Sequence, residues 1–285
     1  DAELVMASDP DADRVGAAVK NNEGEWVLLN GNQTALMFVY YLITRWKELG
    51  KINGKEYIVK TIVTTETIKT IAERNGVEMY DVYTGFKWIA NVMRENEGKK
   101  NYIGGGEESY GFLCEDFVRD KDAVSACVIL AEIAAWAKDQ GLSLYQLLQK
   151  IYVEYGFSKE KGISVVKKGK SGAEEIEAMM KKFRENPLTE IAGSKGTYFY
   201  DYSTLKGKDY AENETVTLDM PTTSNVLQYY TEDGTKVSIR PSGTEPKIKF
   251  YLEVHDTLAC AADYDAKNEW ADAKLDTICK ALGIA

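Results

Sequence analysis

The sequence predicts an α/β protein in three parts: the remnant of one α/β domain, one complete α/β domain with a mixed, mainly parallel sheet, and an α+β C-terminal domain with an antiparallel sheet. In the first half, short apolar β-branched runs alternate with helical patterns, which is typical of parallel sheets. In the second half, short alternating runs are joined by tight turns such as Asp233-Gly234, which favours antiparallel hairpins. The 285 residues, 44% of them hydrophobic, suffice for about two cores.

Apolar periodicity and helix-end signals define the elements of the first half. Gly50, Asn75-Gly76 and Gly141 follow helical patterns as C-terminal caps, and Ser143 precedes one as an N-cap. In chain order we expect a buried strand at 4–7, a hairpin of strands 15–20 and 25–29, a helix at 33–49, a strand at 57–64, a helix at 67–74, a strand at 77–83, a helix at 86–96, a short strand at 102–103, and helices at 123–140 and 144–155.

The second half reads as strands with two helices. Ser171 and Glu174 form a capping box, and Pro187 marks the end of the helix that follows. The expected elements are a strand at 162–167, a helix at 171–184, strands at 197–202, 216–218, 226–230, 235–240 and 247–254, and a helix at 264–281. The predicted domains are residues 1–30, the end of a second α/β domain, residues 31–157, a third α/β domain, and residues 158–285, the C-terminal domain.

Composition excludes several classes of function. The net charge of −10 argues against nucleic-acid and anionic-membrane partners, which need a basic face. Four cysteines without a C-x-x-C pair and a single histidine argue against structural zinc. The cysteine usage indicates a reducing compartment, so we expect a cytoplasmic protein. The strand at 4–7 has no preceding partner strand, so we expect further N-terminal domains of the same polypeptide.

Three carboxylates lie at alternate positions directly after the first strand: Asp9, Asp11 and Asp13. Crowded carboxylates repel one another unless a cation is present, and Mg²⁺ prefers oxygen ligands. The alternative is a solvated acidic turn. An EF-hand is excluded because Arg14 and Lys20 occupy the positions that require Gly and Glu. A haloacid-dehalogenase-like phosphatase also starts with a strand and two aspartates, but its usual threonine is absent here.

A glycine run at 104–106 precedes Glu107 and Ser109. Glycines let a backbone approach a ligand closely, and the acceptor and hydroxyl that follow suit neighbouring sugar hydroxyls. A glycine-rich turn with surface acids is the alternative interpretation.

A third loop, at 240–246, combines a guanidinium, hydroxyls and a glycine in five positions between two strands. Arginine binds phosphate bidentately, and backbone N–H groups around glycine can form an anion nest. The residues of this candidate phosphate loop are Arg240, Ser242, Gly243 and Thr244. The alternative is a solvated basic turn.

Thr84 and Gly85 open a helix after a strand, where N–H groups also favour an anion. His255 is predicted to be a surface residue without a role.

The order and content of these loops resemble the α-D-phosphohexomutase superfamily, specifically bacterial phosphoglucomutase/phosphomannomutase of the phosphopentomutase-like branch. The motifs are D-P-D-A-D-R at 9–14, G-E-E-S-Y-G at 106–111 and R-P-S-G-T-E-P at 240–246, and the likeness covers nearly the whole chain. That family has four domains, the first with a phosphoserine in a T-A-S-H-N-P-like segment. His255 is the only histidine, so no Ser-His pair occurs here. The resemblance implies a C-terminal fragment.

The resemblance also implies a role for each matched residue. Asp9, Asp11 and Asp13 would hold Mg²⁺ together with a phosphoserine oxygen. Arg14 would lie beside the phosphoryl group, and Lys121 would contact phosphate or assist acid–base chemistry. The residues implied to bind a phosphorylated sugar are Thr84, Gly85, Glu107, Ser109, Arg240, Ser242, Gly243, Thr244 and Lys249.

The implied activity is a mutase that interconverts hexose 1-phosphate and hexose 6-phosphate through a phosphoserine and a bisphosphorylated intermediate. A chain without the phosphoserine domain would be inactive alone, because covalent catalysis needs its nucleophile. The alternatives are a non-catalytic phosphosugar-binding module and a metal-dependent sugar phosphatase that uses an aspartate of the first loop as nucleophile.

Overall fold

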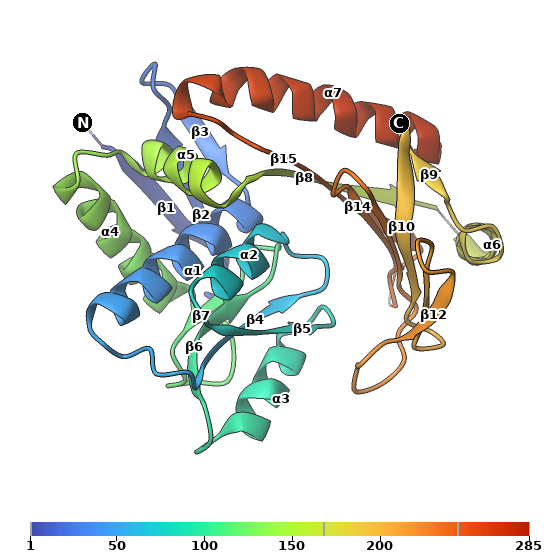
Figure 1. Cartoon of the computed structure of the whole chain (residues 1–285), viewed down its shortest axis with the longest axis horizontal. Coiled ribbons are helices and arrows are strands. Elements are labelled where there is room, and N and C mark those ends of the chain that lie inside the picture. The colour runs from blue at the N-terminus through green and yellow to red at the C-terminus, as the bar shows by residue number, and fades with distance from the viewer. Residues whose placement is uncertain (1, 168, 244, 285) are drawn as a thin grey trace. The chain divides into compact units, whose positions relative to one another are not determined.

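A computed structural model describes residues 2–167, 169–243 and 245–284 (Figure 1). The chain divides into two compact units, the first made of Asp1–Gly156 and Leu258–Ala261, the second of Phe157–Thr257 and Ala262–Ala285. Among the described residues, no helix is both long enough and apolar enough to cross a membrane.

The first unit contains two sheets. One is antiparallel in the order β1-β2-β3. The other has the order β5-β4-β6-β7, with β4 parallel to both β5 and β6, and β7 antiparallel to β6. Their bounds are β1 (Leu4–Ser8), β2 (Val15–Lys20), β3 (Trp26–Leu29), β4 (Glu56–Thr61), β5 (Glu78–Val82), β6 (Asn101–Gly106) and β7 (Phe112–Cys114). The predicted mixed, mainly parallel sheet is confirmed, but β1 is not the buried strand predicted, since Val5 is 49% exposed at the sheet edge.

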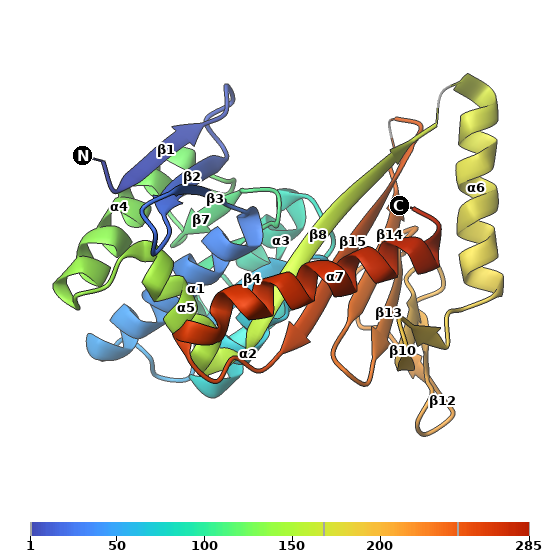
Figure 2. The same ribbon diagram turned by 90° about the horizontal axis from the view of Figure 1, so that it is seen from above.

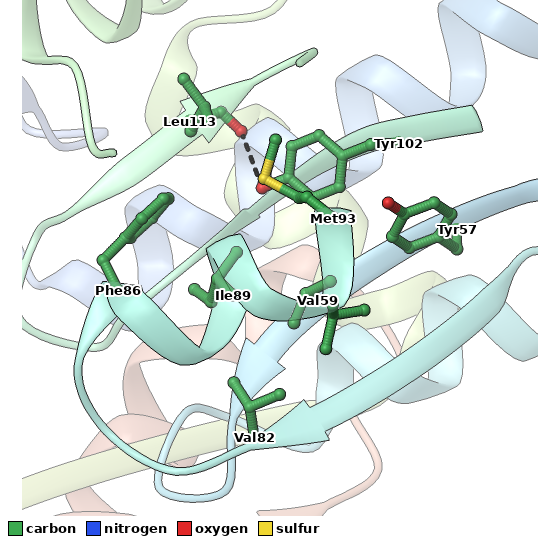
Figure 3. Close-up of a cluster of buried hydrophobic side chains, with 9 residues drawn as sticks. Tyr57, Val59, Val82, Phe86, Ile89, Met93, Tyr102 and Leu113 are labelled. Atoms are coloured by element: carbon green, nitrogen blue, oxygen red, sulfur yellow. Dashed lines mark hydrogen bonds between the residues drawn. The ribbon is translucent and has the colours of Figure 1, made fainter. Parts of the chain in front are cut away.

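Helices cover both faces of the parallel sheet. They are α1 (Gly31–Glu48), α2 (Thr67–Arg74), α3 (Phe86–Asn96), α4 (Ala123–Asp139) and α5 (Leu144–Tyr155). Helix α1 starts two residues before the predicted helix because Asn30 and Gln33 form a capping box. Helices α1, α2, α4 and α5 pack on one another, whereas α3 lies on the opposite face (Figure 1). Figure 3 shows the buried cluster under α3, in which the Tyr102 hydroxyl donates to the Leu113 carbonyl oxygen at 3.4 Å.

The glycine run at 104–106 lies inside β6 and not in a loop, so that part of the prediction is wrong. A Cβ on Gly105 would lie 2.4 Å from the carbonyl oxygen of Val59 on β4. A Cβ on Gly106 would lie 2.5 Å from the carbonyl oxygen of Gly111. Real Cβ atoms do not approach this closely, so these glycines make room for the protein's own strands.

The second unit is an antiparallel sheet with its helices on one face. The strand order is β12-β11-β10-β13-β14-β15-β8, and β9 pairs with β10. The bounds are β8 (Phe157–Val166), α6 (Gly169–Glu185), β9 (Glu190–Ile191), β10 (Ser194–Asp201), β11 (Lys206–Asp209), β12 (Glu214–Thr217), β13 (Leu227–Thr231), β14 (Lys236–Pro241), β15 (Lys247–Asp256), the 3-10 turn η1 (Ala261–Asp263) and α7 (Tyr264–Leu282). This confirms the predicted α+β class, although the sequence patterns missed β9 and β11.

The two faces of this sheet differ in chemistry. On the face covered by α6 and α7 (Figure 2), the Phe250 ring meets Phe183 of α6, and Lys161 of β8 pairs with Asp276 of α7 at 2.7 Å. Because side chains alternate along a strand, Arg240 and Lys249 project from the opposite face. That face therefore carries the predicted phosphate-binding cations.

The same polar face holds a buried ion cluster. Lys236 and Glu253 are each almost fully buried and pair at 2.9 Å. His255 Nε2 lies 2.8 Å from the other oxygen of the Glu253 carboxylate. His255 is therefore not the surface residue without a role that the sequence predicts, because it is part of a structural ion cluster.

Candidate active site in the first unit and phosphate loop in the second

The carboxyl ends of β4, β5 and β6 meet at one edge of the parallel sheet, where ligands bind in such folds. This edge brings together two predicted sugar-binding segments. Glu107 follows β6 and is buried, and its Oε1 accepts a hydrogen bond from the Gly85 backbone N–H at 2.7 Å. Gly85 precedes α3 with a φ of 107°, which favours glycine, and the neighbouring Thr84 is half-buried.

The segment from Glu107 to Gly111, here called the sugar loop, is a tight turn between β6 and β7. It is closed by a hydrogen bond of 2.8 Å from the Glu107 N–H to the Gly111 carbonyl oxygen. Ser109 is exposed at its tip. The Glu108 carboxylate turns away and accepts a hydrogen bond from the Thr61 hydroxyl at 3.2 Å. Sequence reasoning missed Glu108, whose only signal was its place inside the G-E-E-S-Y-G motif.

The segment from Asp9 to Arg14, here called the acidic loop, joins β1 to β2. Asp9 Oδ1 accepts from the backbone N–H groups of Asp13 at 3.1 Å and Arg14 at 3.2 Å. Desolvation opposes the shift, but these hydrogen bonds outweigh it and lower the pKa of Asp9. The Arg14 Nε lies 3.6 Å from both Asp9 and Asp13. Asp11 is exposed.

The three aspartates do not gather around one point, since no group of three His, Cys, Asp or Glu side chains among the described residues is arranged so that it could hold a metal ion. Their joint coordination of a cation therefore stays a prediction. One feature fits a cation: Asp13 Oδ1 is buried and accepts no hydrogen bond in the described part of the chain. This oxygen lies 3.6 Å from Arg14 Nε, which is beyond hydrogen-bond distance, and a hard cation would satisfy it.

Lys121 connects the acidic loop to the sugar loop. Its ammonium lies 2.9 Å from Asp13 Oδ2 and 3.3 Å from Asp120 Oδ1, and 5.5 Å from the centre of the Phe86 ring. Burial tends to lower the pKa of Lys121, but Asp13, Asp120 and Glu107 together raise it. The lysine is thus held as a cation between the two loops.

Backbone contacts join the same segments. The Val15 N–H after the acidic loop donates to the Tyr110 carbonyl oxygen of the sugar loop at 3.1 Å. The Ala123 N–H at the start of α4 donates to the Ala12 carbonyl oxygen at 3.0 Å. The acidic loop, the sugar loop and Lys121 therefore form one continuous site within the first unit.

The phosphate loop connects β14 and β15 in the second unit. Arg240 and Lys249 are paired across these strands, so they lie side by side on the polar face. Neither forms an ion pair with another described residue. The turn is closed by the Ser242 N–H, which donates to the Lys247 carbonyl oxygen at 2.8 Å. Gly243 is exposed, and the predicted contribution of Thr244 lies outside the described residues.

Comparison with known proteins matches both units to one family. Residues 30–155 match the phosphoglucomutase/phosphomannomutase alpha/beta/alpha domain III, and residues 164–268 match the C-terminal domain of the same family. A phosphoglucomutase of Staphylococcus aureus (strain MRSA252) is 38% identical over 253 residues, which is 89% of this chain and 45% of that protein. One of Staphylococcus haemolyticus (strain JCSC1435) is 34% identical over 255 residues, 90% of this chain and 45% of that protein.

Solved structures share the fold. A putative phosphomannomutase from Thermus thermophilus superposes with a TM-score of 0.61 at 18% identity, covering 98% of this chain and 46% of that one. The Paramecium phosphoglucomutase pp63/parafusin gives 0.58 at 17% identity, covering 96% and 45%.

The α/β unit and the antiparallel unit thus correspond to two domains of a single protein family. The chain belongs to the phosphoglucomutase/phosphomannomutase family. It spans about half the length of the curated relatives it matches.

Proposed function

We propose that the complete protein moves phosphate between C1 and C6 of a hexose through a bisphosphorylated intermediate. The phosphoserine that carries the phosphoryl group would lie in the part of the relatives that this chain does not span, so the chain alone would be inactive. The observation that carries the proposal is the continuous site of the first unit, in which Lys121 is held between a half-buried carboxylate, Asp13, and the sugar loop.

Asp9, Asp11 and Asp13 would hold Mg²⁺, and the buried Asp13 Oδ1, which accepts no hydrogen bond in the described part of the chain, supports this assignment. Such an ion would neutralise negative charge that develops on the transferring phosphoryl group.

The chain's own side chains would divide the remaining tasks. Arg14 and Lys121 would provide positive charge beside the reacting phosphoryl group. Glu107, fixed by the Gly85 N–H through one oxygen, would accept a sugar hydroxyl with the other, and Ser109 would contact a neighbouring hydroxyl. Arg240 and Lys249, with the turn at Ser242 and Gly243, would bind the phosphate that is not being transferred.

This division predicts a difference between variants of the two loops in the complete protein. Arg240→Ala should lower kcat/KM about tenfold or more for glucose and mannose phosphates alike, because a charge-assisted phosphate contact is worth about 1.5–3 kcal/mol. Glu107→Gln and Ser109→Ala should instead change the ratio between the two sugars. Steady-state kinetics with both substrates measures each effect, with Arg45→Ala, a partly exposed arginine in the last turn of α1, as the control.

If Arg240→Ala altered the sugar preference, and the sugar-loop variants did not, the two loops would have been assigned to the wrong tasks. An unchanged kcat/KM in Arg240→Ala would remove the phosphate loop from the site altogether.

A further inference from the structure

The sugar loop contains a residue in an unfavourable backbone conformation. Tyr110 has a φ of 73°, in the left-handed region that a bulky side chain rarely adopts. Strained residues of this kind persist only where surrounding contacts determine the backbone. The contacts that hold Tyr110 therefore decide the shape of the loop that carries Glu107 and Ser109.

The first contact comes from the start of α1. Gly31 is the first residue of this helix and is buried. A Cβ at Gly31 would lie 2.0 Å from the carbonyl oxygen of Glu108 and 2.7 Å from the backbone nitrogen of Tyr110. The backbone of α1 thus lies directly against the backbone of the sugar loop, and only glycine leaves room for this approach.

The second contact comes from the end of β4. The Glu108 Oε2 accepts from the Thr61 hydroxyl at 3.2 Å, and Thr61 Oγ1 lies 2.8 Å from Thr64 Oγ1 in another buried hydrogen bond. A third comes from β2, where the Val15 N–H donates to the Tyr110 carbonyl oxygen. Three separate elements therefore fix a five-residue loop on three sides.

We propose that Gly31 and Glu108 are positioning residues of the sugar site. Helix α1 acts through Gly31, and strand β4 acts through the Thr61–Glu108 hydrogen bond. Together they hold the sugar loop in the shape that presents Glu107 and Ser109 to the substrate. Glu108 acts on the loop and not on the sugar, although it stands between the two sugar-binding residues. The role of these two residues in substrate binding rests on the proposed function, whereas the contacts by which they fix the sugar loop do not.

Two measurements on the complete protein test the proposal. The first is hydrogen exchange of the backbone amides at 107–111, of which the Glu107 N–H is hydrogen-bonded to Gly111. The second is the separation of kcat from KM for a hexose phosphate. Glu108→Ala should speed exchange in the loop and raise KM about tenfold, the effect of losing one hydrogen bond to a charged group. Glu108→Gln keeps an acceptor for Thr61 and should stay within about threefold of the parent.

Gly31→Ala should also speed loop exchange and raise KM. Its matched control is Gly162→Ala on β8, where a Cβ would meet nothing within 4 Å and φ is not positive. If Gly31→Ala does not fold, the Glu108 pair still decides the outcome. A loop that exchanges at the parent rate in Glu108→Ala, or a Glu108→Gln variant as impaired as Glu108→Ala, would overturn the proposal. Loss of the proposed function would look different, since the parent itself would then lack mutase activity while the exchange result still stands.

Discussion

Lys121→Met in the complete protein should lower kcat by about 10²–10³-fold, the usual cost of removing one charged group that stabilises a transition state. The Lys121 side chain is 14% exposed, and its ammonium lies 2.9 Å from Asp13. Burial opposes the shift, but Asp13 and Glu107 help to raise the pKa of Lys121. Its removal would take positive charge away from the proposed phosphoryl site and would leave the Asp13 carboxylate with the longer contact to Arg14 at 3.6 Å. Because its pKa is raised, Lys121 stays charged through the neutral range, so it should add no inflection to the pH–rate profile there.

The matched control is Lys138→Met, near the other end of α4. Lys138 pairs with Glu3 at 2.9 Å, but both side chains are well exposed. Exposed ion pairs contribute little, so this variant should keep the parent kcat. A Lys121→Met variant as active as Lys138→Met would exclude Lys121 from the chemistry.

Glu253→Gln should destabilise the second unit by about 3–5 kcal/mol, because it removes the carboxylate that pairs with the buried ammonium of Lys236. Denaturant unfolding of the chain, followed by a probe of the second unit, measures this loss. Glu3→Gln, which breaks an exposed pair, is the control and should change little. Equal unfolding midpoints for the two variants would show that the buried cluster contributes no more than a surface pair.

The same cluster predicts a pH dependence of stability. Burial opposes the shift, but Lys236 and His255 hold the pKa of Glu253 well below its ordinary 4.5. Its stabilisation is present above pH 4.5 and is lost only as pH falls through the lowered value. Burial tends to lower the pKa of His255, but Glu253 and Glu160 outweigh this and the repulsion of Lys236, so the pKa is raised above 6.5.

The stabilisation by His255 is therefore complete below pH 6.5 and is lost as pH rises through the raised value. The free energy of unfolding of the second unit should be greatest between about pH 4.5 and 6.5. His255→Gln should flatten the decline above that range, and urea titrations across pH measure it. A decline unchanged by this substitution would place the titrating group elsewhere.

Local patterns were sufficient to predict most elements of the fold. Helices α2 and α3 have the predicted bounds because their apolar period and their end signals agree. The patterns failed where long-range packing determines the local structure. The glycines at 104–106 look like a loop in sequence, but they lie in a buried strand where β4 and Phe112 fill the space of their side chains. Strand β11, which lies between β12 and β10 and contains two lysines and a glycine, has no apolar alternation to detect.

In the candidate site, too, local motifs were sufficient for some residues, and long-range packing determined the rest. The motifs located Glu107 and Gly85 separately, and the parallel strand topology explains why they meet. The sequence could not reveal that His255 lies beside the Glu253–Lys236 ion pair. The alternation of side chains along a strand shows only that His255 and Glu253 lie on the same face of β15. Nor could it reveal Gly31, whose importance depends on a loop far along the chain that folds against it.

The central claim is that the complete protein is a phosphosugar mutase. Phosphorus NMR of the complete protein with glucose 1-phosphate or mannose 1-phosphate and Mg²⁺ tests it most directly, because the signals of C1-phosphate, C6-phosphate and inorganic phosphate are distinct. The account predicts that the C1-phosphate signal is replaced by the C6-phosphate signal at constant total sugar phosphate, and that a trace of hexose 1,6-bisphosphate accelerates the exchange. Release of inorganic phosphate without any C6-phosphate would contradict it and would indicate a phosphatase.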